Sequence, residues 1–245
     1  MLETIRELAR DLGVNHSSLP EVSIDNGVLD TIPEFLATKG FSDITIVVDQ
    51  HTKRAAGKQL LDMLSEQFNL TRVELKSNKH GPVLAHAQAL VPLMVEMPND
   101  TDVLLAVGSG TIHDIVRFIG YKMEIPFISV PTAASVDGFA SRGAPIILRG
   151  FKQTIQTAAP IAIFADIKII KQAPREMTAA GFGDILGKYT SLTDWKISSI
   201  IGNEPYSELA AKITRQSLES CVAHVEKIAD GDDEGIKILM EALID

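Results

Sequence analysis

The sequence contains a single cysteine, Cys221, so a scaffold of disulfide bonds is excluded. Aromatic residues make up only 5% of the chain, and no apolar run approaches the roughly 18 residues that a membrane-spanning helix needs. Basic residues are scarce relative to acidic ones, since 23 Lys and Arg face 32 Asp and Glu, a formal net charge of −9. That balance argues against sequence-independent binding to nucleic acid, which needs a positive surface. A small anionic ligand stays compatible with it, because a few local donors can hold a phosphate.

The remaining composition is that of a globular protein. Hydrophobic residues make up 45% and charged residues 22% of the 245 residues, so there is enough apolar surface for a core and a disordered chain is excluded. The opening segment, MLETIRELARDLG, has the spacing of a charged amphipathic helix rather than of a signal peptide. We therefore expect a cytoplasmic protein without a membrane span.

Short apolar segments alternate with helical ones through the first two-thirds of the sequence. Predicted strands lie at 44–49, 72–76, 103–108 and 127–131. Apolar runs of this length suit a parallel sheet that is buried on both faces. Helical spacing occupies the intervening segments 53–68, 83–97 and 111–123. Because strand, helix and strand in succession form right-handed βαβ units, we predict the α/β class, an open sheet with helices on both faces.

The pattern changes after residue 144. The stretch 144–166 predicts a hairpin region with Gly150 at its turn and an apolar run leaving it. No strand is predicted after Pro174, and helical spacing occupies 175–196, 207–229 and 233–244. We therefore predict a second, all-helical domain that begins between residues 166 and 174.

A glycine-rich turn joins the apolar strand 103–108 to the following helix, in the segment VLLAVGSGTIHD. Gly108 and Gly110 would let the backbone approach a ligand closely, and the start of a helix offers free N–H groups and the positive end of a dipole. These properties suit a pyrophosphate. The turn could also serve only close packing of the helix, and its spacing is not GxGxxG, so the turn alone leaves both interpretations open.

Polar side chains follow the strand 127–131, at the edge of an open α/β sheet where ligands bind. Thr132, Ser135 and Ser141 can donate hydrogen bonds, and Asp137 can accept them from hydroxyl groups. The alternative is a capped loop, in which these side chains serve only the local turns.

Two further carboxylates are candidates for ligand binding. Asp184 lies in AAGFGDILGK, where three glycines indicate the close approach of another group, so we favour a ligand role over a helix cap. Asp49 ends the strand ITIVVD, and a carboxylate at a strand end can accept both ribose hydroxyls of NAD. For Asp49 taken alone, a turn residue is the alternative.

Together these segments resemble the glycerol-1-phosphate dehydrogenase family, close to its bacterial AraM-like members, within the dehydroquinate synthase and iron-containing alcohol dehydrogenase superfamily. The resemblance runs from Asp49 to about Trp195 and is strongest in GSGTIHD, ISVPTAASVDGFAS and AAGFGDILGKYTSLTDWK. It implies a dehydroquinate synthase-like fold, with an NAD-binding α/β domain at 1–165. Residues 166–245 would form the N-terminal part of a helical domain that binds metal and substrate.

The resemblance also implies the residues of the site. Those implied for the cofactor are Asp49, Gly110, Thr111, Ile112, His113, Asp114, Thr132, Ala133, Ala134, Ser135 and Ser141. The implied catalytic residues are Asp137, which would contact the substrate, and Asp184, which would contact the substrate and bind a divalent metal (zinc, nickel or iron). The implied reaction interconverts sn-glycerol 1-phosphate and dihydroxyacetone phosphate by metal-assisted hydride transfer with NAD or NADP, in phospholipid biosynthesis.

Charges near the motifs bear on the choice of cofactor and substrate. The charge of Asp49 opposes a 2′-phosphate and so favours NAD over NADP. Three nearby basic side chains could soften that preference: His51, Lys53 and Arg54. Lys188 and Arg142 are the basic residues close to the motifs and could hold a substrate phosphate, with exposed salt bridges as the alternative use of both.

One part of the family's metal site is missing. Members complete it with two histidines from later helices, whereas His224 is the only histidine after Asp184. One carboxylate and one imidazole fall short of the three protein ligands usual for zinc, so we expect His224 to lie on a helix face without a metal. The last helical segment also ends at Asp245 with an apolar stripe and no cap. We therefore expect a C-terminally truncated family member, either natural or an incomplete sequence.

Two alternative functions stay open. A polyol dehydrogenase such as glycerol dehydrogenase shares the fold but takes an uncharged substrate. A non-catalytic nucleotide-binding remnant accounts for the missing histidines. In either enzyme interpretation we expect a homo-oligomer, and the main interpretation adds a small phosphorylated substrate and no nucleic acid.

Overall fold

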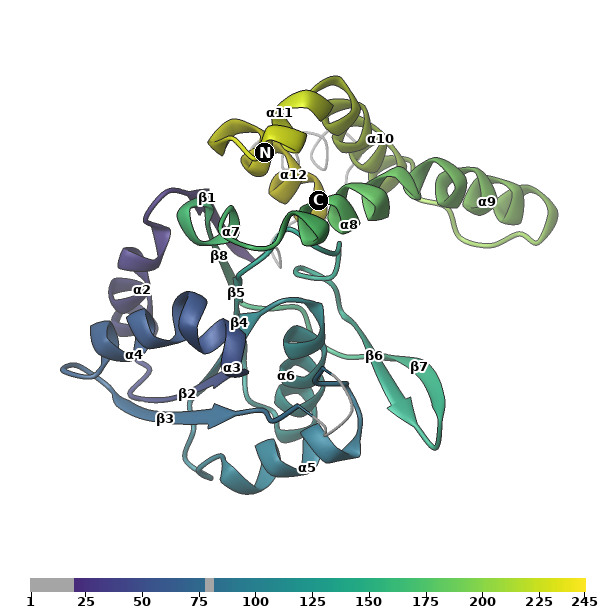
Figure 1. Ribbon diagram of the computed structural model, residues 1–245. Coiled ribbons are helices and arrows are strands. Elements are labelled where there is room, and N and C mark those ends of the chain that lie inside the picture. Colours follow the sequence, from purple (N-terminus) through teal and green to yellow (C-terminus); the bar gives the residue numbers. More distant parts are fainter. Residues whose placement is uncertain (1–19, 78–81) are drawn as a thin grey trace. The chain divides into compact units, whose positions relative to one another are not determined.

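The computed structural model describes residues 20–77 and 82–245 (Figure 1). They form two compact units. One contains Pro20–Ala133 and Gly138–Ala173 and is called the α/β unit below. The other contains Ala134–Asp137 and Pro174–Asp245 and is called the helical unit. The amphipathic helix expected at residues 1–13 lies outside the described residues.

The α/β unit is built on a six-stranded parallel sheet with the order β1-β8-β5-β4-β2-β3. Its strands are β1 (Glu21–Asp25), β2 (Asp43–Val48), β3 (Asn69–Glu74), β4 (Val103–Gly108), β5 (Phe127–Pro131) and β8 (Ala162–Asp166). The four strands predicted in the first two-thirds of the chain are present, with ends shifted by a few residues at β2 and β3. The edge strand β1 was not among the predicted strands.

Helices cover both faces of this sheet. They are the 3₁₀ turn η1 (Val28–Thr31), α2 (Ile32–Lys39), α3 (Gln50–Thr52), the π-helical turn η2 (Lys53–Gly57), α4 (Lys58–Leu64), α5 (Ala87–Glu96), α6 (Gly110–Met123) and α7 (Ile167–Ile170). Helices α2 and α4 lie on one face, and α5 and α6 lie on the other (Figure 1). Neighbouring residues of β4 serve opposite faces, since Leu105 packs with α2 and α4 whereas Leu104 packs with α5 and α6. Burial on both faces explains the continuous apolar runs of the sequence.

A two-stranded antiparallel hairpin, β6 (Gly143–Leu148) and β7 (Phe151–Gln156), also belongs to the α/β unit. Its turn contains Arg149 and Gly150, both with positive φ, of 51° and 83°. The predicted turn at Gly150 is therefore confirmed. The side chains of Ala144 and Ile146 pack into the same apolar cluster as α6, which anchors the hairpin on one face of the unit.

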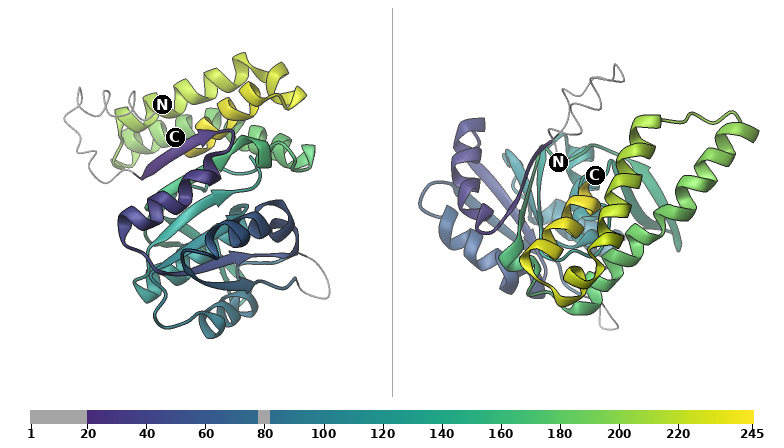
Figure 2. Two further views of the ribbon diagram at one scale, coloured as in Figure 1. Left: turned by 90° about the vertical axis from the view of Figure 1, so that its left-hand side faces the viewer. Right: turned by 90° about the horizontal axis from the view of Figure 1, so that it is seen from above.

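The helical unit contains α8 (Arg175–Leu186), α9 (Lys188–Ile201), α10 (Glu208–Ala223), α11 (Val225–Asp230) and α12 (Asp233–Ile244). The described residues after Pro174 contain no strand, as predicted. Two predicted helices are each divided, at Gly187 and at His224. The last three helices gather side by side (Figure 2), around buried side chains that include Cys221, Leu239 and Met240. Within the described part of the chain, no helix has the length and apolar character needed to cross a bilayer.

Candidate functional site

The carboxyl ends of β2 and β4 lie side by side at the point where the strand order reverses. Strand β3 lies on one side of β2 and β4 on the other, with Val47 of β2 in register with Ala106 of β4. Asp49 follows β2, and the glycine turn follows β4, so both emerge at this reversal. In open α/β sheets, ligands bind in the crevice outside the carboxyl ends of the strands at such a point.

Asp49 is the N-cap of the helical segment that begins at Gln50. Its Oδ1 accepts hydrogen bonds from the backbone N–H groups of His51 and Thr52, both at 2.8 Å. The N–H of Asp49 donates to the Thr52 hydroxyl at 2.9 Å, which completes a capping box. The second carboxylate oxygen, Oδ2, accepts no hydrogen bond from the described residues. The carboxylate is thus held in place by one oxygen and can accept ribose hydroxyls with the other.

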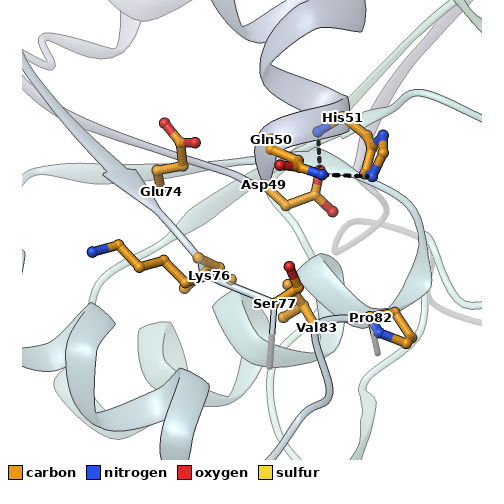
Figure 3. Close-up of a pocket in the computed structure, with 9 residues that line it drawn as sticks. Asp49, Gln50, His51, Glu74, Lys76, Ser77, Pro82 and Val83 are labelled. Atoms are coloured by element: carbon orange, nitrogen blue, oxygen red, sulfur yellow. Dashed lines mark hydrogen bonds between the residues drawn. The ribbon is translucent and has the colours of Figure 1, made fainter. Parts of the chain in front are cut away.

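A pocket of about 360 Å³ opens beside Asp49 (Figure 3). It lies at the carboxyl ends of β2 and β3 and is lined by Asp49, Gln50, His51, Glu74, Leu75, Lys76, Ser77, Pro82 and Val83. In Figure 3 the carboxylate of Glu74 comes from the end of β3, and that of Asp49 comes from the residue directly after β2. A pocket at the carboxyl ends of two parallel strands, with the Asp49 carboxylate in its lining, suits the adenosine end of a dinucleotide.

The glycine turn leads directly into α6, with Ser109 as the N-cap. In the first backbone hydrogen bond of this helix, His113 N donates to Ser109 O at 3.3 Å. The N–H groups of Gly110, Thr111 and Ile112 come before this bond and therefore have no acceptor within the helix. A Cβ added at Gly108 would lie 2.5 Å from Ile112 Cδ1, so this glycine is needed for packing. The two interpretations of the turn are therefore compatible. The N–H groups at the positive end of the helix dipole fit the pyrophosphate of NAD(P).

His113 lies in the first turn of α6, but its side chain is fully buried. Its Nδ1 lies 2.9 Å from the Ser109 carbonyl oxygen, and its ring meets Phe139 edge-on at 5.0 Å between centroids. Burial lowers the pKa of His113 to about 3, so the ring is neutral at physiological pH. The ring of His113 is therefore held inside the α/β unit.

Asp114 is paired with Arg117, a residue that the sequence patterns did not single out. One guanidinium nitrogen of Arg117 donates to Asp114 Oδ1 at 2.9 Å and to the Gly143 carbonyl at 3.1 Å, and the other donates to the Gly138 carbonyl. Burial raises the pKa of Asp114 to about 6, although the charge of Arg117 acts to lower it. Asp114 and Arg117 therefore form a largely buried ion pair. The spacing of an acid and a base three residues apart on one helix is the signal that could have indicated the pair.

The segments that flank the loop after β5 are tied to the rest of the α/β unit. The N–H of Thr132 donates to the Gly108 carbonyl at 3.0 Å, and Thr132 and Ala133 are both buried. The Ser141 hydroxyl accepts the N–H of Gly143 at 2.8 Å, as expected for the capped-loop alternative. Arg142, one candidate for the substrate phosphate, donates from Nε to the Thr157 carbonyl at 3.4 Å.

The helical unit brings the two predicted catalytic carboxylates together. Asp184 Oδ2 accepts the backbone N–H of Asp137 at 2.9 Å, and Lys188 Nζ donates to Asp137 Oδ2. Burial is the main reason that the pKa of Asp184 is raised, and the neighbouring charge of Asp137 raises it further. Two other predicted residues belong to the same short segment: Ala134, which is buried, and Ser135, which is half-buried.

The described residues do not complete a metal site. Among them, no three His, Cys, Asp or Glu side chains come together in a way that could hold a metal ion. Asp184 is accompanied by Asp137 and Lys188, whereas His224 ends α10 with its Nδ1 2.8 Å from the Ser220 carbonyl oxygen. Since three protein ligands are usual for a catalytic zinc, this donor set does not fit the metal by itself.

Comparison with known proteins matches residues 23–174 to the family model described as iron-containing alcohol dehydrogenase. The chain is 45% identical over 247 residues to a glycerol-1-phosphate dehydrogenase (NAD(P)+) of Geobacillus thermodenitrificans, covering 99% of this chain and 61% of that protein. It is 50% identical over 220 residues to the protein of that name from Bacillus licheniformis, covering 90% and 55%. The chain thus spans roughly three-fifths of the length of these curated relatives, and the resemblance stated from the motifs is confirmed.

Solved structures confirm the predicted fold. Glycerol dehydrogenase from Schizosaccharomyces pombe superimposes with a TM-score of 0.73 at 24% identity, over 92% of this chain and 59% of that one. A probable glycerol dehydrogenase from Sinorhizobium meliloti 1021 gives a TM-score of 0.74 at 18% identity, over 94% and 64%. At these identities the likeness concerns the fold, not the substrate.

Proposed function

This chain belongs to the iron-containing alcohol dehydrogenase family, and from that premise we propose that its α/β unit binds NAD(P). We further propose that the whole protein interconverts sn-glycerol 1-phosphate and dihydroxyacetone phosphate, the activity that the names of its curated relatives indicate. The bound nicotinamide would supply the hydride acceptor or donor. The residues of this chain would bind and orient the reactants and hold the charges around them.

One observation carries the nucleotide proposal: two groups with different ligand preferences emerge at the same reversal of strand order. The free Oδ2 of Asp49 suits ribose hydroxyls, and the N–H groups of Gly110, Thr111 and Ile112 suit the pyrophosphate. The remaining residues proposed for the cofactor are His113, Asp114, Thr132, Ala133, Ala134, Ser135 and Ser141.

Asp137 and Asp184 would provide the substrate side. Their carboxylates can accept hydrogen bonds from the hydroxyl groups of a glycerol moiety. Lys188 neutralises Asp137 and lies where its ammonium could also meet a phosphate. The choice of a phosphorylated substrate over an uncharged polyol follows the names of the curated relatives, because the charge of Lys188 is already balanced by Asp137.

Turnover by this chain itself depends on the groups around Asp184. The described residues lack three donors gathered around Asp184, and that observation favours a second candidate, a polypeptide that binds nucleotide without completing the reaction. We propose that Asp184 contributes to a divalent metal site in the whole protein. We also propose that the whole protein is a homo-oligomer, is cytoplasmic and has no nucleic-acid partner.

The proposed nucleotide site is tested by titrating the chain with NADH and following nucleotide fluorescence. Asp49→Ala should weaken NADH binding by roughly 10- to 100-fold, since a hydrogen bond to a charged group is worth about 1.5–3 kcal/mol. Gly110→Val should have a larger effect and abolish NADH binding, because the branched side chain would crowd the pyrophosphate. NADPH binding should change less than NADH binding in Asp49→Ala.

Asp232→Ala is the matched control, because Asp232 also caps a helix with its carboxylate, accepting the N–H of Gly235 at 2.6 Å. It should cost about 1 kcal/mol of stability, as cap loss at Asp49 does, and leave NADH binding unchanged. Equal dissociation constants for the parent and Asp49→Ala would remove Asp49 from the site. Retained affinity in Gly110→Val would make the glycine turn a packing feature only.

A further inference from the structure

The pocket beside Asp49 carries a charge arrangement that bears on which nucleotide it accepts. Among the residues that line it, two are carboxylates, Asp49 and Glu74, and one is an ammonium, Lys76. A nucleotide with a free 2′-hydroxyl adds no charge at the ribose, whereas a 2′-phosphate adds up to two negative charges there. The position of each cation near the pocket therefore decides how well a 2′-phosphate is tolerated.

Lys53 is a cation close to Asp49, but Glu74 holds it. The backbone N–H of Lys53 donates to the Asp49 carbonyl at 2.9 Å, so Lys53 lies one helical turn after Asp49, the residue proposed to bind the ribose. Its Nζ lies 2.8 Å from Glu74 Oε2, and both side chains are about one-third exposed. Arg72 lies 4.0 Å from the same Glu74 oxygen. The Glu74 carboxylate thus attracts two cations at the edge of the pocket, Lys53 and Arg72.

The other basic groups near the pocket are differently placed. The ammonium of Lys76 points away from Asp49 in Figure 3. The ring of His51 is engaged with Gln50, with 3.2 Å between His51 Nε2 and the Gln50 side-chain nitrogen. Lys53, which contacts Glu74 more closely than Arg72 does, is therefore the cation whose availability a substitution of Glu74 should change most.

We propose that Glu74 is a specificity-determining residue, which makes the pocket prefer NAD over NADP by holding the ammonium of Lys53 and by adding its own negative charge. This inference rests on the proposed nucleotide site. Removing the Glu74 charge frees Lys53 to pair with a 2′-phosphate and removes a repulsion from it. Asp49 still opposes the 2′-phosphate, so Glu74 tunes the ratio of the two affinities and does not reverse it alone.

The test measures dissociation constants for NADH and NADPH by nucleotide fluorescence in the parent chain and in Glu74→Gln. The glutamine keeps the size of the side chain and removes its charge. Affinity for NADPH relative to NADH should rise by about tenfold, the effect of one hydrogen bond to a charged group. The NADH affinity should change by a smaller factor than the NADPH affinity. The gain should shrink at high salt, because the charges concerned are partly exposed.

Two further variants separate the causes. Glu66→Gln removes an exposed carboxylate outside the pocket lining and should leave the NADPH-to-NADH ratio unchanged. Lys53→Met combined with Glu74→Gln should cancel the gain, because the freed cation is gone. A gain that persists in the double variant overturns the role of Lys53, and an unchanged ratio in Glu74→Gln overturns the inference. Failure of the parent to bind NADH is a different result, since it overturns the nucleotide site on which the inference rests.

Discussion

Arg117 is a fully buried cation whose charge is compensated from three directions. Asp114 and the carbonyl groups of Gly138 and Gly143 accept its guanidinium hydrogen bonds, and its guanidinium lies 5.7 Å from the centroid of the Phe127 ring. Its Nε has no hydrogen-bond partner among the described residues. Because the acceptors lie on α6, in the loop before β6 and at the first residue of β6, one side chain ties α6 to that loop.

We expect Arg117→Met to destabilise the α/β unit by about 3–5 kcal/mol, because Asp114 loses the cation that compensates it in a buried site. Urea unfolding followed by circular dichroism measures the change. Combining it with Asp114→Asn should recover part of the loss, since no unpaired charge remains. Arg72→Met, at a side chain 43% exposed, is the control and should cost less than about 1 kcal/mol. A change below that level in Arg117→Met would show that the buried pair is not structurally important.

His113 should make the stability of the α/β unit depend on pH. Its pKa in the folded chain is about 3, below the usual 6.5, because burial disfavours the charged ring. The contribution of a depressed pKa is fully present above pH 6.5 and is lost as the pH falls towards 3. Between pH 7 and pH 5 the loss from this residue alone should be about 2 kcal/mol.

The comparison of the parent with His113→Phe isolates this effect, because other groups cancel in the difference. Asp114 in particular acts in the opposite sense, since its raised pKa adds stability as the pH falls through 6. The phenylalanine variant should lose less stability between pH 7 and pH 5 than the parent, whereas the exposed-site control His51→Gln should behave like the parent. Parallel pH curves for the parent and His113→Phe would contradict the assignment.

At the scale of elements, helix α8 owes its position to one glycine. A Cβ on Gly181 would lie 2.2 Å from the Ala134 carbonyl oxygen and 3.2 Å from Leu243 Cδ1. This close approach presses α8 against the segment Ala134–Asp137. Three residues further along the helix, Asp184 accepts the N–H of Asp137. The contact between the two predicted catalytic residues therefore depends on the absence of a side chain at position 181.

We expect Gly181→Ala to destabilise the helical unit by about 1–3 kcal/mol, because the added methyl group cannot fit without moving α8. Gly183 lies in the same helix with no atom within 4 Å of an added Cβ, so Gly183→Ala is a matched control. It should stabilise by up to about 1 kcal/mol through higher helix propensity. Thermal unfolding of both variants measures the contrast. The same sign of effect at both positions would contradict the packing argument.

Which elements the sequence could predict follows from how each is buried. Strands β4 and β5 have the predicted bounds, because both are buried at every position and leave an uninterrupted apolar run. Strand β1 (EVSID) lies at an edge, is exposed or half-buried throughout, and carries no such run. The division between α8 and α9 at Gly187 was missed, because helical spacing continues across it and no proline marks it.

The candidate site divides in a similar way. Asp49 could be proposed from the sequence, because a carboxylate directly after a buried strand is a local pattern. The ion pair of Lys188 with Asp137 joins residues 51 positions apart, so no local pattern contains it. The hydrogen bonds from Arg117 to the carbonyls of Gly138 and Gly143 could not be predicted either, because every residue carries a backbone carbonyl and no sequence pattern marks the acceptor.

At the scale of the whole molecule, we expect nucleotide binding without metal binding. We expect the 245-residue chain to bind NADH but to show no stoichiometric binding of zinc, nickel or iron(II) at Asp184, because the described residues bring no three donors together. Calorimetric metal titration of the parent and of Asp184→Asn should give the same weak response. Oxidation of NADH by dihydroxyacetone phosphate should be slow with each metal.

Stoichiometric metal binding that Asp184→Asn removes would contradict this expectation. It would mean that donors outside the described residues complete the site. Rapid turnover without such binding would instead mean that the reaction does not need a metal at Asp184.

The pairing of β1 with β8 sets an order of events during protein synthesis. The residues of β1 pair with residues that follow about 140 positions later, whereas β2, β3, β4 and β5 can pair among themselves before β8 exists. At a translation rate of about 5–20 residues per second, β1 waits on the order of 10 seconds after leaving the ribosome. During that interval its backbone donors and acceptors have no strand beside them. Among the described residues, the first strand to be made is therefore the last to be paired, and a chain that stops before residue 162 leaves β1 without its partner.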